Sequence, residues 1–221
     1  MHNEFWLERW QNKQTGFHQQ QVNPYLVKYW PLLDNGANNR VFVPLCGKSA
    51  DLVWLRQQGC EVVGVELSQL AVEAFFAEQE IEYETSTKGK LKLFKACNMT
   101  IFQGDFFDLS KDLLGPITAI FDRAALIALP ETMRGAYCKH LASLATKAEM
   151  LLISMEYQQS AMQGPPFSVA ESEIVQYYSA PDTIQLIDSA DLLKISSQFS
   201  QQGLDRIDEK VFKISLTGTT K

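Results

Sequence analysis

The sequence predicts an α/β fold: a doubly wound, mostly parallel sheet of seven strands with an antiparallel last strand and an N-terminal helical cap. After about residue 40, short β-branched or apolar runs alternate with longer amphipathic segments, as in parallel strands linked by helices. Residues 40–68 add a strand, a tight turn, a helix and a second strand that ends on an acid. With 221 residues, 46% of them hydrophobic, we expect a single domain over residues 1–221.

Each predicted element follows from its residue pattern. Strands are predicted where apolar residues alternate with polar ones or form a short continuous run, and helices where apolar residues recur at helical spacing. The predicted strands are Arg40–Leu45, Glu61–Glu66, Met99–Gln103, Ile117–Phe121, Glu149–Met155, Thr183–Asp188 and Lys210–Leu216. The predicted helices are Ala50–Gln58, Leu70–Glu80, Pro130–Leu144 and Val169–Tyr178. The last two strands are separated only by a loop, which predicts an antiparallel pair. The irregular stretch Glu82–Asn98 predicts an extra turn or ribbon.

Residues 1–39 depart from the alternating pattern and contain three of the four tryptophans. The segment is too polar for a core and too aromatic for a disordered tail. Two interpretations stay open: helices docked on the edge of the sheet, or a cap over the mouth of a ligand site.

Composition excludes several classes of partner. The net charge of -6 argues against nucleic acid, because no basic excess is available to neutralise phosphates. The four cysteines form no C-x-x-C pair and the three histidines lack ligand spacing, so we expect no metal. Scattered cysteines predict reduced thiols and a cytoplasmic protein. No apolar run approaches about 18 residues and no signal peptide is evident, so we expect no membrane partner. No pattern predicts assembly, and we expect a monomer.

The turn at Gly47 and the acid Glu66 together predict a site for an adenosine-containing cofactor. Glu66 lies about 20 residues after the turn, at the end of a buried strand, where two ribose hydroxyls would satisfy its carboxylate. Phe42 stands where a Walker A loop needs its first glycine, and a G-x-G-x-x-G fingerprint is absent. A ligand without phosphates, such as S-adenosylmethionine, suits the single glycine. The alternatives are a plain turn at Gly47 and a helix cap at Glu66.

Side chains that follow the third and fourth strands fall at the edge where open α/β sheets bind ligands. Asp105 and Phe106 follow the third strand and predict a hydrogen-bond acceptor and a stacking ring for adenine, or simply a turn. Asp122 and Arg123 follow the fourth strand and predict either site residues at the mouth or a surface ion pair.

The segment after the fifth strand, Gln163–Phe167, contains two consecutive prolines. Prolines remove backbone donors and stiffen the chain, so Pro166 and Phe167 could line one side of a flat aromatic substrate. The alternative is a connector that merely ends the strand.

Taken together, these motifs resemble the thiopurine S-methyltransferase family of S-adenosylmethionine-dependent, Rossmann-like methyltransferases. The resemblance is carried by W-x3-W and F-H (Trp6, Trp10, Phe17-His18), V-F-V-P-L-C-G-K (Val41–Lys48), V-V-G-V-E (Val62–Glu66), F-D-R-A-A-L (Phe121–Leu126) and G-P-P-F (Gly164–Phe167). The motifs occur in the order of the family and cover nearly the whole chain. The resemblance implies S-methylation of an aromatic or heterocyclic thiol, with residues 1–39 as a cap over the site.

The resemblance also implies roles for single residues. Those that match the family's cofactor contacts are Trp10, Leu45, Glu66 and Arg123, with Asp105 and Phe106 beside the adenine. Phe17 matches a position that touches the aromatic substrate. Vertebrate relatives carry an arginine shortly before the last strand, where this chain has Gln198, and this difference places the burden of catalysis on Arg123.

The implied reaction is the displacement of S-adenosylhomocysteine by a substrate sulfur that takes the methyl group. Arg123 would favour the thiolate electrostatically and Asp122 would orient Arg123, without a metal or a cysteine nucleophile. Three alternatives stay open. The acceptor atom could be oxygen, nitrogen, selenium or tellurium, and bacterial relatives are associated with tolerance to tellurium and selenium oxyanions. A nicotinamide oxidoreductase is disfavoured by the missing glycines, and a non-catalytic cofactor-binding regulator would not need an aromatic entrance.

Overall fold

The structure is a computed structural model, and it describes residues 3–33, 39–178, 184–195 and 204–217. The chain divides into two compact units, residues 1–121 and 122–221. The division falls inside strand β6 (Ala119–Arg123), so Asp122 and Arg123 begin the second unit. The sheet has nine strands in the described part of the chain, rather than the seven expected.

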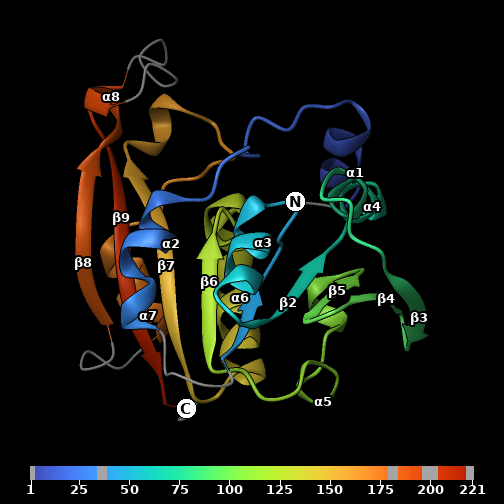
Figure 1. The fold of residues 1–221 in the computed structure, drawn as a ribbon. Coiled ribbons are helices and arrows are strands. Elements are labelled where there is room, and N and C mark those ends of the chain that lie inside the picture. The colour runs from blue at the N-terminus through green and yellow to red at the C-terminus, as the bar shows by residue number, and fades with distance from the viewer. Residues whose placement is uncertain (1–2, 34–38, 179–183, 196–203, 218–221) are drawn as a thin grey trace. The chain divides into compact units, whose positions relative to one another are not determined.

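In the first unit, strands and helices alternate as the sequence predicts (Figure 1). The strand order is β3-β4-β5-β2-β1-β6, and the central strands β5, β2, β1 and β6 are parallel. The strands are β1 (Arg40–Val43), β2 (Glu61–Glu66), β3 (Glu84–Lys88), β4 (Leu91–Ala96) and β5 (Met99–Gln103). The helices are α1 (Asn3–Gln11), α2 (Pro24–Tyr29), α3 (Ala50–Gln57), α4 (Gln69–Glu78) and α5 (Lys111–Leu114), with short 3-10 turns η1 (Trp30–Leu32) and η2 (Phe106–Asp108).

Strand β2 is the centre of the first unit, and its sequence explains why. Val62, Val63 and Val65 are fully buried, and β-branched side chains suit a strand covered on both faces. The helices on either side of β2 in the sequence begin at serine caps: the Ser49 and Ser68 hydroxyl oxygens accept from backbone N–H groups of α3 and α4. Both helices contact β2. Helix α3 begins after the end of β1, and α4 begins after the end of β2.

The two additional strands form the ribbon that the stretch Glu82–Asn98 was expected to contain. Strand β3 pairs with β4, and β4 pairs with β5, both antiparallel. Every residue of β3 is exposed, so the strand carries no apolar alternation from which the sequence could count it. The expected number of seven strands was wrong for this reason.

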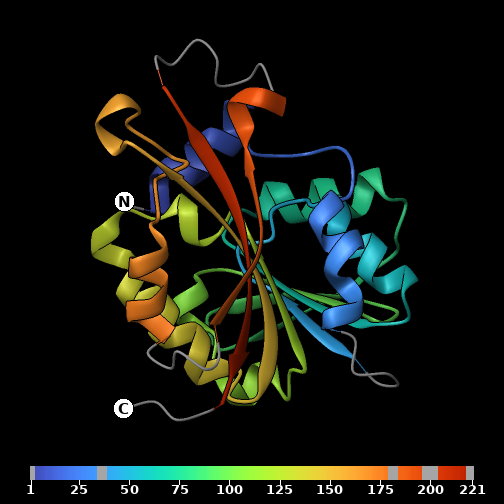
Figure 2. The same cartoon turned by 90° about the vertical axis from the view of Figure 1, so that its left-hand side faces the viewer.

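In the second unit the strand order is β7-β9-β8, and both pairs are antiparallel (Figure 2). The long register from Ala148↔Leu216 to Tyr157↔Ile207 confirms the antiparallel last strand. The elements are η3 (Leu126–Ala128), α6 (Glu131–Leu144), β7 (Ala148–Tyr157), η4 (Gln159–Ala161), α7 (Glu171–Tyr178), β8 (Ile184–Asp191), α8 (Leu192–Ile195) and β9 (Ile207–Leu216). Thr183, the expected start of β8, lies outside the described residues.

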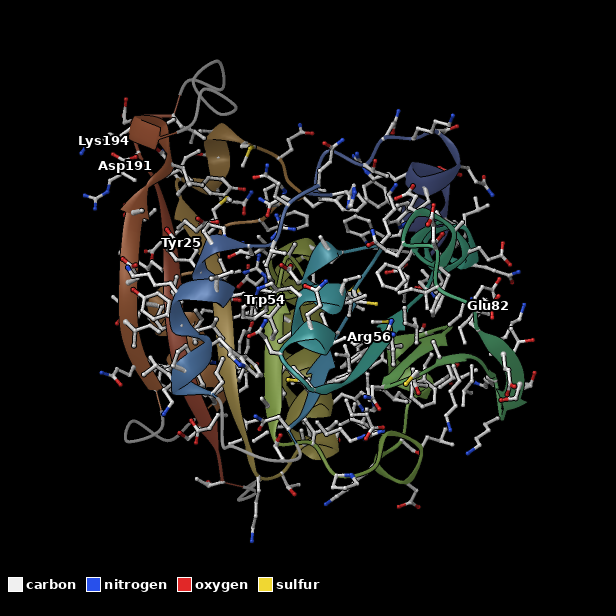
Figure 3. The ribbon with its side chains drawn as sticks, in the orientation of Figure 1. Tyr25, Trp54, Arg56, Glu82, Asp191 and Lys194 are labelled. Carbon is white, nitrogen blue, oxygen red and sulfur yellow. The ribbon has the colours of Figure 1, made fainter. Side chains whose placement is uncertain are left out.

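The end of β8 shows how one acid starts the short helix α8. Asp191 accepts from the Leu193 backbone N–H at 3.1 Å, and Lys194 Nζ lies 3.4 Å from the same carboxylate. Figure 3 labels Asp191 and Lys194 side by side at this point. Lys194 is largely exposed, so water screens the ion pair and it adds little to stability.

Candidate functional site

The turn after β1 supplies backbone donors at the end of a buried strand. Leu45 and Gly47 both have left-handed conformations, with φ of 45° and 54°. The Cys46 N–H donates to Val65 O at 3.0 Å, and the Gly47 N–H donates to Glu66 Oε2 at 2.9 Å. A side chain at Gly47 would be strained, and its Cβ would lie 3.2 Å from Trp10 Cζ2. Glycine is therefore required here by conformation and by the close approach of Trp10.

Glu66 is the acid at the end of β2, and only 6% of it is exposed. Its second oxygen, Oε1, accepts from the Ser68 N–H at 2.7 Å. Burial raises the pKa of the Glu66 carboxyl, and the backbone hydrogen bonds from Ser68, Gly47 and Leu67 partly counteract this. A carboxylate accepts about four hydrogen bonds, so Glu66 retains capacity for a further donor. The cap of α4 is Ser68 rather than Glu66.

An aromatic cluster lies beside this turn in the first unit. Trp10 packs against Gly47, and the ring of Phe17 makes edge contacts with Trp10 and Trp6 at centroid distances of 5.4 and 5.6 Å. Helix α1, which carries both tryptophans, contacts α4 (Figure 1). The structure thus places one predicted site residue, Trp10, on the glycine turn, and a second, Phe17, against Trp10.

The segment that carries Phe17 is held at its far end by a residue that the sequence analysis missed. Asp51 is 3% exposed and accepts from the Asn23 N–H at 2.7 Å and from the Ser49 hydroxyl at 2.7 Å. Residues 12–22 therefore run between α1 and a fixed point next to α3 (Figure 1). The available signal was an acid two residues after a serine cap, which also occurs in ordinary helices.

Asp105 and Phe106 follow β5, and Asp105 caps the 3-10 turn η2. Its carboxylate accepts from the Phe107 N–H at 2.9 Å and from Asn3 Nδ2 at 2.8 Å. Phe106 is 4% exposed, whereas the neighbouring Phe107 is 41% exposed. Phe107, which the sequence analysis did not single out, offers the more accessible ring at this strand end.

In the second unit, Asp122 is completely buried, which excludes a surface ion pair for its carboxylate. Oδ2 accepts from the Tyr137 hydroxyl at 2.7 Å, and Oδ1 accepts from the Leu126 N–H at 3.2 Å. Burial raises the pKa of Asp122 to about 6, against the lowering effect of these hydrogen bonds. One oxygen of Asp122 therefore holds the turn after β6 and the other binds α6, and half-buried Arg123 follows directly in the chain.

The loop Gly164–Phe167 is held at several points within the second unit. The Phe167 N–H donates to Ile127 O at 2.7 Å, and the Tyr157 hydroxyl donates to Pro166 O at 2.6 Å. Gly164 has φ 72°, and a Cβ there would lie 2.6 Å from the Phe167 ring. Half-buried Pro166 and Phe167 are therefore set by the surrounding chain, as expected of a rigid loop.

Metal-binding groups and membrane-spanning helices were also sought among the described residues. Among residues 3–33, 39–178, 184–195 and 204–217, no group of three or more His, Cys, Asp or Glu side chains is placed to hold a metal ion. Within the same residues, no helix has the length and apolar character needed to cross a membrane. Gln198 lies outside the described part of the chain.

The arrangement resembles known proteins in sequence and in fold. The model of the family described as thiopurine S-methyltransferase matches residues 1–217. A thiopurine S-methyltransferase of Bordetella petrii is 46% identical over 97% of this chain and 99% of its own, and that of Nitrosospira multiformis is 45% identical over 96% and 97%. A 1,6-didemethyltoxoflavin-N1-methyltransferase of Burkholderia thailandensis, solved with S-adenosylhomocysteine, has a TM-score of 0.61 at 13% identity, covering 96% of this chain and 87% of that one.

Proposed function

This chain belongs to the thiopurine S-methyltransferase family, and from that premise we propose that it moves the methyl group of S-adenosylmethionine to the sulfur of an aromatic or heterocyclic thiol. The observation that carries the proposal is Glu66, a buried carboxylate at the end of a parallel strand, one oxygen of which accepts from the glycine turn. The partner is a small molecule, and neither nucleic acid nor a membrane is needed.

The residues around Gly47 fit S-adenosylmethionine by their chemistry. Glu66 retains acceptor capacity and would hold the ribose hydroxyls, while Gly47 leaves the turn free of a side chain at its tightest point and Leu45 would border the cofactor from the same turn. Asp105 and Phe106 are proposed to border the adenine. When bound, S-adenosylmethionine supplies a methyl group made electrophilic by its sulfonium.

The aromatic cluster is proposed to form the cap of the site. Trp10 lies on the glycine turn and Phe17 packs against Trp10, so the two rings would exclude water from the cofactor, and Phe17 would touch the acceptor. We propose that residues 1–39 belong to one methyltransferase domain that spans residues 1–221. The contact between Trp10 and Gly47 favours a cap over the ligand site rather than helices that only dock on the edge of the sheet.

Arg123 is proposed to stabilise the thiolate form of the acceptor. Its guanidinium stays charged at all physiological pH values. A permanent positive charge lowers the pKa of a nearby thiol and so favours the thiolate. Asp122 would position Arg123 through the backbone, because its carboxylate ties the turn after β6, through the Leu126 N–H, to Tyr137 on α6. Pro166 and Phe167 would line one side of the acceptor.

The proposal is tested by incubating the protein with labelled S-adenosylmethionine and one of 6-mercaptopurine, a phenol, an amine, selenite or tellurite. We expect label in S-methylated 6-mercaptopurine at a rate that exceeds the phenol and amine by at least about tenfold. Transfer to selenium or tellurium alone would replace the thiol by a metalloid acceptor and a role in detoxification and tellurite resistance. Binding of S-adenosylhomocysteine without any turnover would leave a cofactor-binding regulator.

Compartment and assembly belong to the same proposal. Cys46, Cys97 and Cys138 are free thiols in the described part of the chain, which suits the reducing cytoplasm. We propose a monomer, to be measured by sedimentation at micromolar concentration.

A further inference from the structure

Arg134, on α6, is a buried cation for which the proposed chemistry has no role. The residue is 3% exposed. Its Nε donates to Leu129 O at 2.9 Å, and its Nη1 donates to both oxygens of Glu173 at 2.9 and 2.8 Å. Its Cζ lies 5.9 Å from the centroid of the Phe167 ring. One side chain in the second unit thus contacts the segment after Arg123, helix α7 and the proposed acceptor loop.

The partners of Arg134 are themselves fixed. Glu173 also accepts from the Tyr177 hydroxyl at 2.6 Å, and it comes from α7, which lies beside α6 (Figure 2). The Phe167 backbone donates to Ile127 O, two residues before the carbonyl that Arg134 binds. The side chain and the backbone therefore connect the same two segments at neighbouring points.

A buried ion pair is weak evidence of a contribution to stability, because desolvation of the two charges offsets their attraction. The geometry suits arginine in another way. A planar guanidinium can donate at its edge in two directions and present a face to a ring, whereas a lysine ammonium is a compact point charge. Arg134 does both: it donates to Leu129 and Glu173 and lies over Phe167.

We infer that Arg134 is a positioning residue for the acceptor site: it holds the ring of Phe167 in one orientation against the segment that follows Arg123. The inference rests on the proposed function, because it takes Phe167 to line the acceptor. The partners of Arg134 given above all belong to the second unit, so we expect its effect on the acceptor and not on S-adenosylmethionine.

The first test is Arg134→Lys, which keeps the charge and loses the planar group. We expect the KM for 6-mercaptopurine to rise about 5-fold, the scale of coupling between contacting residues. The dissociation constant of S-adenosylhomocysteine should stay within about twofold of wild type. The control is Lys213→Met, which breaks the 3.1 Å ion pair with Glu149 between β9 and β7 and should leave both values unchanged. An unchanged KM in Arg134→Lys overturns the inference.

The second test asks whether Arg134 acts through Phe167. In a Phe167→Leu background the ring is absent, so Arg134→Lys should change the acceptor KM by less than about twofold. Independent, multiplying effects of the two substitutions would show that Arg134 does not act through the ring and would reject the inference.

A third measurement decides the matter even if no thiol is methylated. Exchange of the Phe167 backbone N–H, which Ile127 O protects, should be about 5-fold faster in Arg134→Lys than in wild type and unchanged in Lys213→Met. Equal exchange in wild type and Arg134→Lys would reject positioning by Arg134. A wild-type protein that turns over no thiol would instead reject the proposed function, while the exchange result would stand by itself.

Discussion

Replacing Glu66 with glutamine perturbs the proposed cofactor site at one atom. The carboxylate accepts from the Gly47 and Ser68 N–H groups on opposite oxygens. Glutamine has one acceptor oxygen and one NH₂ group, so one of the two backbone donors would face another donor. The substitution keeps the size of the side chain and removes its charge.

Two losses follow from this geometry, and they are measured separately. An unsatisfied buried donor costs about 1–3 kcal/mol of folding stability, and losing hydrogen bonds from ribose hydroxyls to a charged acceptor costs about 1.5–3 kcal/mol of binding. The second loss corresponds to affinity for S-adenosylhomocysteine that is weaker by about 10- to 150-fold. Glu66→Ala should weaken binding by a similar amount.

Calorimetric titration with S-adenosylhomocysteine measures the binding loss, and urea unfolding confirms that each variant is folded at the temperature used. Glu61→Gln is the matched control, because Glu61 begins the same strand and pairs with Arg40 at the surface. In wild type, affinity should also fall as the pH is lowered through the raised pKa of Glu66, since a protonated carboxyl loses acceptor capacity. A folded Glu66→Gln protein that binds within twofold of wild type would refute the reasoning.

Three further predictions concern other site residues. Arg123→Ala should lower kcat/KM for the thiol while circular dichroism stays unchanged; intact kinetics would remove Arg123 from the mechanism. Asp122 holds its proton to about pH 6 in the folded protein and to the ordinary 3.8 in the unfolded chain, so unfolding free energy should fall by about 3 kcal/mol as pH rises through that window. Asp122→Asn should lack this component, and equal pH slopes would contradict it. Saturating S-adenosylhomocysteine and thiol should change the fluorescence that Trp10→Phe removes, and an unresponsive Trp10 would argue against the cap.

The strand β2 and the turn at Gly47 were the most predictable part of the site. Strand β2 occupies Glu61–Glu66 as expected, because a short run that contains three valines is typical of a buried parallel strand. The same pattern assigned Gly47 and Glu66 to one predicted site, and in the structure the Gly47 N–H donates to Glu66. Local residues sufficed because both strand and turn are decided by contacts close to them.

Features that depend on distant contacts could not be predicted. The partner of Asp122 is Tyr137 on α6, and a strand-end aspartate in the sequence is equally consistent with an exposed ion pair. Arg134 reads as an ordinary helix surface residue, yet α7 and the Phe167 loop bury it. Strand β3 was not counted, because pairing with β4 alone makes it a strand.

A crystal structure with S-adenosylhomocysteine tests the central assignment most directly. The account predicts that both ribose hydroxyls lie within hydrogen-bonding distance of the Glu66 carboxylate, about 2.5–3.0 Å from its oxygens. It also predicts that the homocysteine portion passes the turn at Gly47. A ribose bound elsewhere, with the Glu66 carboxylate in contact only with its own backbone partners, would contradict the account.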